Sequence, residues 1–337
     1  MSIVTERKEV VDIYAEAAGR HWVIPAFGSE NLTTTEAVLS AVKEYGERSG
    51  IKNLPITIAI TNLYDHRSQS ANYSHSKNWK TGLKLFLADL QVLAGEDSPY
   101  ADLNVMIHLD HIQPESDKEL LSWDMRQFSS IMFDASVYPW EENLKRTAEF
   151  VEKNRDKIVI EGACDEIIDA GGNEVNKLTD AQKALDYVQK TDVDFIVANL
   201  GTEHRASSSD LKYHGDLAGK IRDLVGTKLV LHGCSSVSQR QLQTLFLDGI
   251  CKVNIWTILE RDSSPVLFEN MVKNAAKVAG THSAAQLAEY SYLGTAADLK
   301  SRANLAYFTT VYRQNIIFNE MKKIVESYLK LFYHFTN

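Results

Sequence analysis

The amino-acid sequence predicts an α/β fold, a closed (β/α)8 TIM barrel followed by a C-terminal helical extension. Short apolar, β-branched runs alternate with longer segments of helical periodicity, as is typical of a parallel sheet covered by helices. Eight such units follow one another, and right-handed crossovers can close eight units into a barrel. An open doubly wound sheet is the competing fold, but eight units in one series favour closure. We expect a single barrel domain over residues 1–337, with the helical extension beginning at about residue 284.

The predicted strands are recognised by their near-continuous hydrophobic character, as expected for strands that are buried on both faces. In chain order they are His21–Phe27, Pro55–Thr61, Asn104–Leu109, Ser130–Phe133, Lys157–Ile160, Asp194–Asn199, Thr227–Leu231 and Cys251–Ile255.

Several of the intervening segments carry helix-boundary signals. Residues 34–50 begin with capping threonines and end on a glycine. Residues 139–154 begin with a proline and carboxylates, which helix N-termini prefer. Residues 236–249 lie between a serine cap and Gly249. Residues 305–335 predict a long helix that packs outside the barrel or contributes to a dimer.

Charge and composition exclude several classes of protein. The 337 residues are 44% hydrophobic, enough for a large core. The formal net charge of −9 argues against a nucleic-acid-binding surface, which needs a basic face. The first residues lack the apolar core of a signal peptide, and no apolar stretch is long enough to span a membrane. Three cysteines without CxxC spacing indicate a reduced, cytoplasmic protein.

Three histidines fall at or just beyond the ends of predicted strands, where catalytic groups of this barrel gather. His111 follows the third strand, His204 follows the sixth, and His232 closes the seventh. Each alone is more simply a hydrogen-bonded core or loop residue, but three together favour a metal site. Three imidazoles with one open position are typical of catalytic zinc, although imidazole also binds other divalent metals. His108 points to the same side of its strand as Asp110, and a structural role for it is favoured over that of a fourth ligand.

Seven short segments between Ile24 and Thr257 carry a further signal. They are IPAFGSEN, NVMIHLDH, SSIMFDASVYPWEEN, AGGNE, GTEH, LVLHGCSS and GICKVNIWT. In this order they resemble the class II, metal-dependent ketose-bisphosphate aldolases. Any one of the segments is a weak signal, but seven in the family's order are a strong one, and the chain is identified as a divergent member.

The resemblance implies a lyase that reversibly cleaves a phosphorylated ketose, or a related sugar acid, to dihydroxyacetone phosphate and an aldehyde. Cleavage next to a ketone makes an enediolate, whose negative charge a Lewis-acid metal stabilises. The resemblance assigns one zinc ion to His111, His204 and His232. Asp110 would remove the hydroxyl proton, and a neighbouring metal would keep its carboxylate ionised. The purely structural alternative is that the Asp110 side chain caps the end of its strand.

Glu174 resembles the family's glutamate that handles the carbon-bound proton of the donor. Gly171 and Gly172 give its loop the freedom to close over the substrate. A solvated loop residue is an equally simple interpretation of Glu174. The resemblance also leaves open a monovalent cation as a further cofactor, and it favours a homodimer or higher homo-oligomer.

The loops after strands seven and eight commonly bind phosphate in this barrel. Gly233, Ser235, Asn254 and Thr257 are therefore predicted to contact the substrate phosphate. Asn254 and Thr257 could instead simply end the eighth strand. Arg205, where relatives have glycine, could clamp an anion with its planar guanidinium, or point outward and pair with a surface carboxylate.

Other departures from the family concern the substrate and the surroundings of the metal. Cys234 and Ser236 replace glycines and would narrow the approach of a phosphate to the backbone. Ala163 stands where a second glutamate is expected, and losing such a supporting group weakens metal binding. Trp256 takes a position that is small or acidic in relatives, and Gly28 replaces an asparagine. These changes put a fructose bisphosphate substrate in doubt while leaving aldol chemistry intact.

Two other functions compete with aldol cleavage. A metal-dependent barrel hydrolase would be expected to have additional carboxylate ligands or a second metal. A non-catalytic, aldolase-like subunit would have lost the histidines or Asp110, and all of these residues are present.

Overall fold

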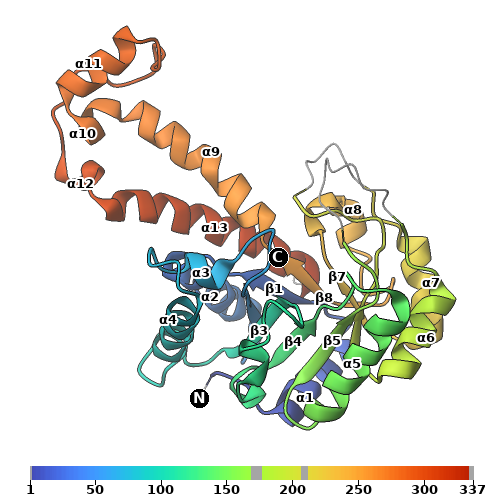
Figure 1. Ribbon diagram of the computed structural model, residues 1–337. Coiled ribbons are helices and arrows are strands. Elements are labelled where there is room, and N and C mark those ends of the chain that lie inside the picture. Colours follow the sequence, from blue (N-terminus) through green and yellow to red (C-terminus); the bar gives the residue numbers. More distant parts are fainter. Residues whose placement is uncertain (1, 168–176, 206–211, 334–337) are drawn as a thin grey trace.

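The computed structural model describes residues 2–167, 177–205 and 212–333. In this part of the chain, parallel strands form a closed barrel in sequence order, with β8 paired to β1 (Figure 1). The strands are β1 (Ile24–Gly28), β2 (Pro55–Thr61), β3 (Asn104–Ile112), β4 (Ser130–Phe133), β5 (Val159–Ala163), β6 (Phe195–Val197), β7 (Leu229–Leu231) and β8 (Ile250–Ile255). The predicted (β/α)8 TIM barrel with C-terminal helices is confirmed.

Helices surround the barrel and continue beyond it (Figure 1). Before β8 they are α1 (Arg7–Gly19), α2 (Leu32–Ser49), α3 (Gln69–Asn72), α4 (Trp79–Leu93), α5 (Trp140–Asn154), α6 (Ala181–Thr191), α7 (Gly215–Val225) and α8 (Gln239–Leu242), with 3-10 turns η1 (Leu120–Ser122), η2 (Met125–Gln127) and η3 (Cys234–Ser236). After β8 come α9 (Thr257–Lys273), α10 (Ala275–Ala279), α11 (Thr281–Glu289), α12 (Leu305–Phe308) and α13 (Thr310–Phe332).

Helix boundaries follow local capping chemistry, with three corrections to the sequence predictions. The long helix predicted over residues 305–335 is interrupted at Thr309, whose backbone is extended, and ends at Phe332. The cap of α2 is Asn31, whose side chain accepts from the amide of Thr34 at 3.2 Å, so the threonines lie inside the helix. The helix predicted over residues 236–249 is shorter. A capping box at Ser238 starts α8, but α8 ends at Leu242, and backbone bonds to the third preceding residue form turns up to Gly249.

Six strands differ in extent from their predictions, and three of them show why apolar character alone does not decide where a strand ends. His21 has a positive φ of 59°, so the chain turns there and β1 starts only at Ile24. β5 continues to Ala163, three residues beyond its predicted end. β3 continues to Ile112 and therefore contains both Asp110 and His111.

The C-terminal helices pack against one side of the barrel and then leave it. α13 packs against α2 and α9 outside the barrel, and the hydroxyl of Tyr333 donates to the carbonyl of Pro55 at the start of β2. Farther out, α9 and α13 carry α10, α11 and α12 away from the barrel (Figure 1). We call residues 265–312 the projecting arm. Within the described residues, no helix is both long and apolar enough to cross a membrane.

Candidate metal centre and active site

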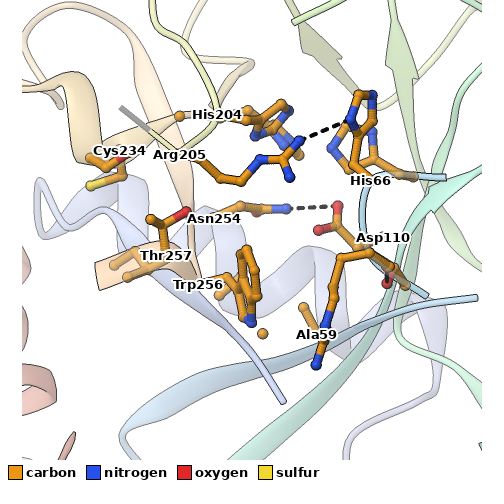
Figure 2. A pocket seen from close by; sticks show the side chains of 18 of the residues that line it. Ala59, His66, Asp110, His204, Arg205, Cys234, Asn254, Trp256 and Thr257 are labelled. Atoms are coloured by element: carbon orange, nitrogen blue, oxygen red, sulfur yellow. Dashed lines mark hydrogen bonds between the residues drawn. The ribbon is translucent and has the colours of Figure 1, made fainter. Parts of the chain in front are cut away.

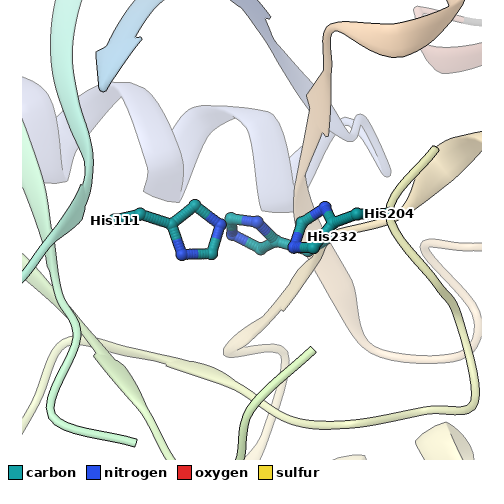
Figure 3. Close-up of side chains that lie close together, drawn as sticks. All are labelled: His111, His204 and His232. Atoms are coloured by element: carbon teal, nitrogen blue, oxygen red, sulfur yellow. The ribbon is translucent and has the colours of Figure 1, made fainter. Parts of the chain in front are cut away.

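Three histidine side chains converge at the carboxyl end of the barrel (Figure 3). His111 lies in β3, His232 directly follows β7, and His204 lies between β6 and α7. Their candidate ligand atoms all lie within 4.8 Å of one another. The Nε2 atoms of His111 and His232 are buried without a hydrogen-bond partner. Burying such atoms costs free energy unless a ligand or a metal ion binds to them. A divalent metal fits this set, because three imidazoles can bind it and leave a position open.

The ring of His111 is fixed from behind by an acidic side chain. Its Nδ1 lies 3.0 Å from Oδ2 of Asp134, and Ser136 donates its hydroxyl to the other oxygen of Asp134 at 2.6 Å. Tyr64 stacks on the face of the same ring, with ring centroids 4.3 Å apart and an interplanar angle of 5°. A carboxylate on Nδ1 sets the tautomer and leaves Nε2 for a metal. Neither Asp134 nor Tyr64 was predicted from the sequence, although Asp134 directly follows β4 on the catalytic edge.

An irregularity in β3 brings Asp110 and His111 to the same side. Adjacent side chains in a regular strand point to opposite faces. Here the register between β3 and β4 shifts between Leu109 and Ile112, and His111 has a φ of +50°. A bulge of this kind re-aims side chains next to active sites. Both Asp110 and His111 therefore line one cavity together with His204 and His232.

Asp110 is held as an ionised carboxylate by its surroundings. Asn254 donates its amide to Oδ1 of Asp110 at 2.9 Å (Figure 2). Burial alone would raise the pKa of Asp110, but His111, His108 and His232 together hold it well below its usual range. Burial and the neighbouring imidazoles also hold the pKa of His232 well below its usual range, so this ring is neutral and able to bind a metal. Asn254, predicted to contact phosphate, thus lies beside the candidate proton-transfer group.

Behind the metal centre, the barrel interior contains a buried network of charged and polar groups. Nδ1 of His108 lies 2.9 Å from the hydroxyl of Ser130, while its Nε2 lies 3.6 Å from Asp110 and 3.7 Å from Glu161. Lys252 in β8 donates to Oε1 of Glu161 at 2.7 Å, and both side chains are fully buried. His108 is outside the ligand cluster, in line with a structural role. Lys252 was not predicted from the sequence, although a lysine inside an apolar strand signals a buried partner.

The predicted phosphate-binding residues lie on the β7–β8 side of the same cavity. Gly233, Ser235 and Thr257 line it, next to Cys234. Gly233 has a φ of +65°, and a Cβ there would come within 3.0 Å of the backbone of Glu203. The expectation that the residue at 236 narrows the phosphate approach is wrong, because that side chain is fully buried and its hydroxyl accepts from the amide of Glu203 at 2.8 Å.

Arg205 reaches across the cavity mouth. Its Nη2 lies 3.1 Å from Nδ1 of His66, which follows β2 (Figure 2).

Ala163, where a second acidic residue was expected, is buried among apolar side chains. Asp165, two residues farther along the chain, accepts from the hydroxyl of Thr179 at 2.8 Å and from Lys183. The predicted loop residues Gly171, Gly172 and Glu174 lie outside the described residues.

Two departures that looked separate in the sequence are in contact in the structure. A Cβ added to Gly28 would lie 3.1 Å from Cβ and 3.2 Å from Cδ1 of Trp256. It would also lie 3.0 Å from the side-chain nitrogen of Gln69. The indole therefore occupies the space that a side chain at residue 28 would need, and both Trp256 and Gly28 line the cavity.

Comparison with known proteins agrees with this geometry. The family profile described as fructose-bisphosphate aldolase class-II matches residues 8–334. The chain belongs to this class II aldolase family. Membership supports aldol cleavage by a metal-dependent lyase, and the histidine cluster could hold the metal.

Solved structures of similar proteins share the fold. The fructose-bisphosphate aldolase of Campylobacter jejuni has a TM-score of 0.75 at 17% identity, covering 98% of this chain and 95% of its own. The YdjI aldolase of Escherichia coli K12 has a TM-score of 0.65 at 19% identity, covering 95% and 94%. A putative fructose-1,6-biphosphate aldolase of Coccidioides immitis has a TM-score of 0.65 at 18% identity, covering 97% and 96%.

Proposed function

We propose that this chain is a zinc-dependent aldolase that reversibly cleaves a phosphorylated ketose, or a related sugar acid, to dihydroxyacetone phosphate and an aldehyde. The observation that carries the proposal is the meeting of three imidazoles with an ionised carboxylate, Asp110, in one cavity. Three imidazoles with an open position favour zinc, and the other divalent metals that imidazole binds are the alternatives.

The residues divide the chemistry between them. His111, His204 and His232 would hold the metal, which supplies Lewis-acid stabilisation for the negative charge of the enediolate. Asp110 accepts the proton of the hydroxyl group on the aldehyde-forming carbon as the carbon–carbon bond breaks, and returns it in condensation. The amide of Asn254 orients the carboxylate for this transfer.

The donor half of the substrate is assigned to the β7–β8 side of the cavity. Gly233, Ser235 and Thr257 would contact its phosphate, and Arg205 would add a guanidinium from the cavity mouth. Glu174 would exchange the carbon-bound proton of the donor, a role that follows from the family resemblance.

The test combines metal analysis with a cleavage assay. We expect about one zinc per chain, and release of dihydroxyacetone phosphate from a panel of ketose phosphates. Asp110→Asn should retain the metal and lose about 10²- to 10⁴-fold in kcat. Asp97→Asn, on the exposed loop before β3 at the opposite end of the barrel, is the matched control. A protein without metal that zinc does not activate would refute the proposal, as would hydrolysis without carbon–carbon cleavage.

We also propose that two copies associate through the projecting arm. It exposes large apolar side chains, which are Phe268, Leu287, Tyr290, Tyr292, Leu305, Phe308 and Val311. The arm has four basic and three acidic residues, whereas the whole chain has a net charge of −9, so the arm complements the acidic body of a second copy. Light scattering should give twice the mass of 37.9 kDa. The variant Phe268→Glu should have the mass of one chain. A wild type with the mass of one chain, or a Phe268→Glu variant that keeps the mass of two, would contradict the proposal.

A further inference from the structure

The cavity continues past the metal centre to the β1–β2 side of the barrel. There it is lined by Gly28, Arg67, Gln69 and Trp256, none of which contributes to the proposed donor site. If the donor phosphate lies on the β7–β8 side, the aldehyde half must lie here. The chemistry inferred for the aldehyde half therefore rests on the proposed function.

Trp256 reduces the room on this side. Figure 2 shows its indole between Thr257 and Ala59, below the hydrogen bond from Asn254 to Asp110. Its contact with Gly28 leaves no space for a polar side chain at that position. An aromatic ring that lines this side of the cavity favours C–H groups of a polyol over a strongly hydrated anion.

The cationic group on this side, Arg67, is already paired. Its Nε lies 3.1 Å from both carboxylate oxygens of Glu30, and its Nη2 also donates to Glu30. The Glu30 side chain is only 7% exposed, so its carboxylate depends on the Arg67 guanidinium, and not on solvent, for its hydrogen bonds. Gln69 donates to the same carboxylate at 3.3 Å and accepts from the amide of Thr61 at 2.8 Å. The positive charge of Arg67 is therefore paired with a buried carboxylate, although the Arg67 side chain itself is 42% exposed.

A second carboxyl group, that of Glu260, lies near the pair of Arg67 and Glu30. Glu260, in the first turn of α9, accepts from the hydroxyl of Thr34 at 3.4 Å. Burial and the charge of Glu30 raise the pKa of Glu260 to about 7, and Arg67 opposes this shift. Around Arg67 there are thus two carboxyl groups for one guanidinium. Glu30 is ionised and paired with Arg67, and Glu260, with a pKa of about 7, is about half ionised at neutral pH. A phosphate dianion bound here would therefore meet more negative charge than Arg67 offsets.

We propose that the aldehyde half is a neutral, unphosphorylated hydroxyaldehyde, so that the cleaved sugar carries a single phosphate, on its donor half. In cleavage, the bond between the donor carbon and the aldehyde-forming carbon breaks, and its electron pair passes to the donor as an enediolate. The hydroxyl proton goes to Asp110, and protonation of the enediolate completes dihydroxyacetone phosphate.

The test runs the reaction as condensation with the zinc-loaded full chain. Dihydroxyacetone phosphate is the donor, and glyceraldehyde is compared with glyceraldehyde 3-phosphate as acceptor. We expect kcat/KM for glyceraldehyde to be higher by about tenfold or more, the scale of one unfavourable charge contact. Equal use of the two aldehydes, or preference for the phosphorylated one, overturns the inference but leaves the aldolase proposal intact. Failure of both aldehydes to react, with no ketose phosphate cleaved, refutes the aldolase proposal and this inference with it.

A variant separates charge neutralisation from an orienting role of Glu30. Glu30→Gln should raise kcat/KM for glyceraldehyde 3-phosphate and narrow the preference by about tenfold. Glu47→Gln, at the exposed end of α2, is the matched control. A fall in kcat/KM for the phosphorylated aldehyde in Glu30→Gln would mean that Glu30 orients Arg67 for a phosphate, and would overturn the inference. If Glu30→Gln does not fold, Trp256→Ser tests the same preference by enlarging the subsite. We expect the ratio of kcat/KM for glyceraldehyde to that for glyceraldehyde 3-phosphate to fall in this variant, and an unchanged ratio would contradict the inference.

Discussion

The ion pair between Lys252 and Glu161 lies inside the barrel, where the surrounding strands exclude water. Nζ of Lys252 is 2.7 Å from Oε1 of Glu161, and neither side chain is exposed. Oε2 of Glu161 is buried without a hydrogen-bond partner, and Nε2 of His108 lies 3.7 Å from it. The lysine is therefore the main group that compensates this carboxylate. We choose Lys252→Met, which keeps much of the side-chain volume and removes the charge.

The expected cost is large. Removing one partner of a buried ion pair leaves an uncompensated charge and typically costs about 3–5 kcal/mol. That is a major share of the roughly 5–15 kcal/mol by which folded domains are stable. The double variant Lys252→Met with Glu161→Gln removes both charges, and we expect it to recover about half or more of the loss, because a neutral amide is cheaper to bury.

Urea unfolding followed by circular dichroism gives the free energies of the wild type, both single variants and the double variant. Lys323→Met is the matched control, because Lys323 makes an exposed ion pair of 2.8 Å with Glu320. A surface pair contributes about 0–1 kcal/mol, so this control should unfold at nearly the wild-type midpoint. A loss below about 1 kcal/mol in Lys252→Met, or strictly additive single and double variants, would refute the reasoning.

Three further predictions concern protonation, the metal and the backbone. Burial raises the pKa of Glu260 to about 7, so its stabilising contribution is complete below about pH 4.5 and is lost as the pH rises through 7. Glu260→Gln should therefore gain about 2 kcal/mol relative to the wild type between pH 5 and pH 8 in pH-dependent unfolding, allowing for partial exposure, and a gain independent of pH would contradict this. Asp134→Asn, which weakens the support of His111, should lower zinc affinity about 10- to 100-fold in chelator competition, whereas unchanged affinity would argue against that role. Gly233→Ala should lose about 1–3 kcal/mol in thermal unfolding because of its positive φ and the nearby backbone. Gly219→Ala, which meets no atom within 4 Å in α7, should not be destabilised, and equal losses in both would count against the strain.

The features that the sequence predicts are those that depend on local pattern. Apolar runs separated by helical segments are enough to predict a barrel, because a strand buried on both faces must be apolar along its length. Strand ends then locate His111, His204 and His232 on one edge, since parallel strands bring their carboxyl ends together. Asp110 is found because it adjoins a predicted ligand.

The remaining features depend on contacts between distant segments. The bulge that aims Asp110 and His111 into one cavity is a register shift between β3 and β4, and no local residue pattern encodes it. The contact of Gly28 with Trp256 joins β1 to the end of β8, so each residue alone looks like an unexplained change. The direction of the projecting arm is likewise set by how α9 and α13 pack together.

The central claim is that a metal held by three histidines allows the protein to form an enediolate from the donor. Deuterium exchange into dihydroxyacetone phosphate, followed by NMR in D2O without any aldehyde, tests this without knowledge of the full substrate. The exchange should be absent in the metal-free protein, rise with added zinc to a plateau at about one equivalent per chain, and disappear on chelation. Exchange that needs no metal, or zinc-loaded protein that exchanges nothing, would contradict the account.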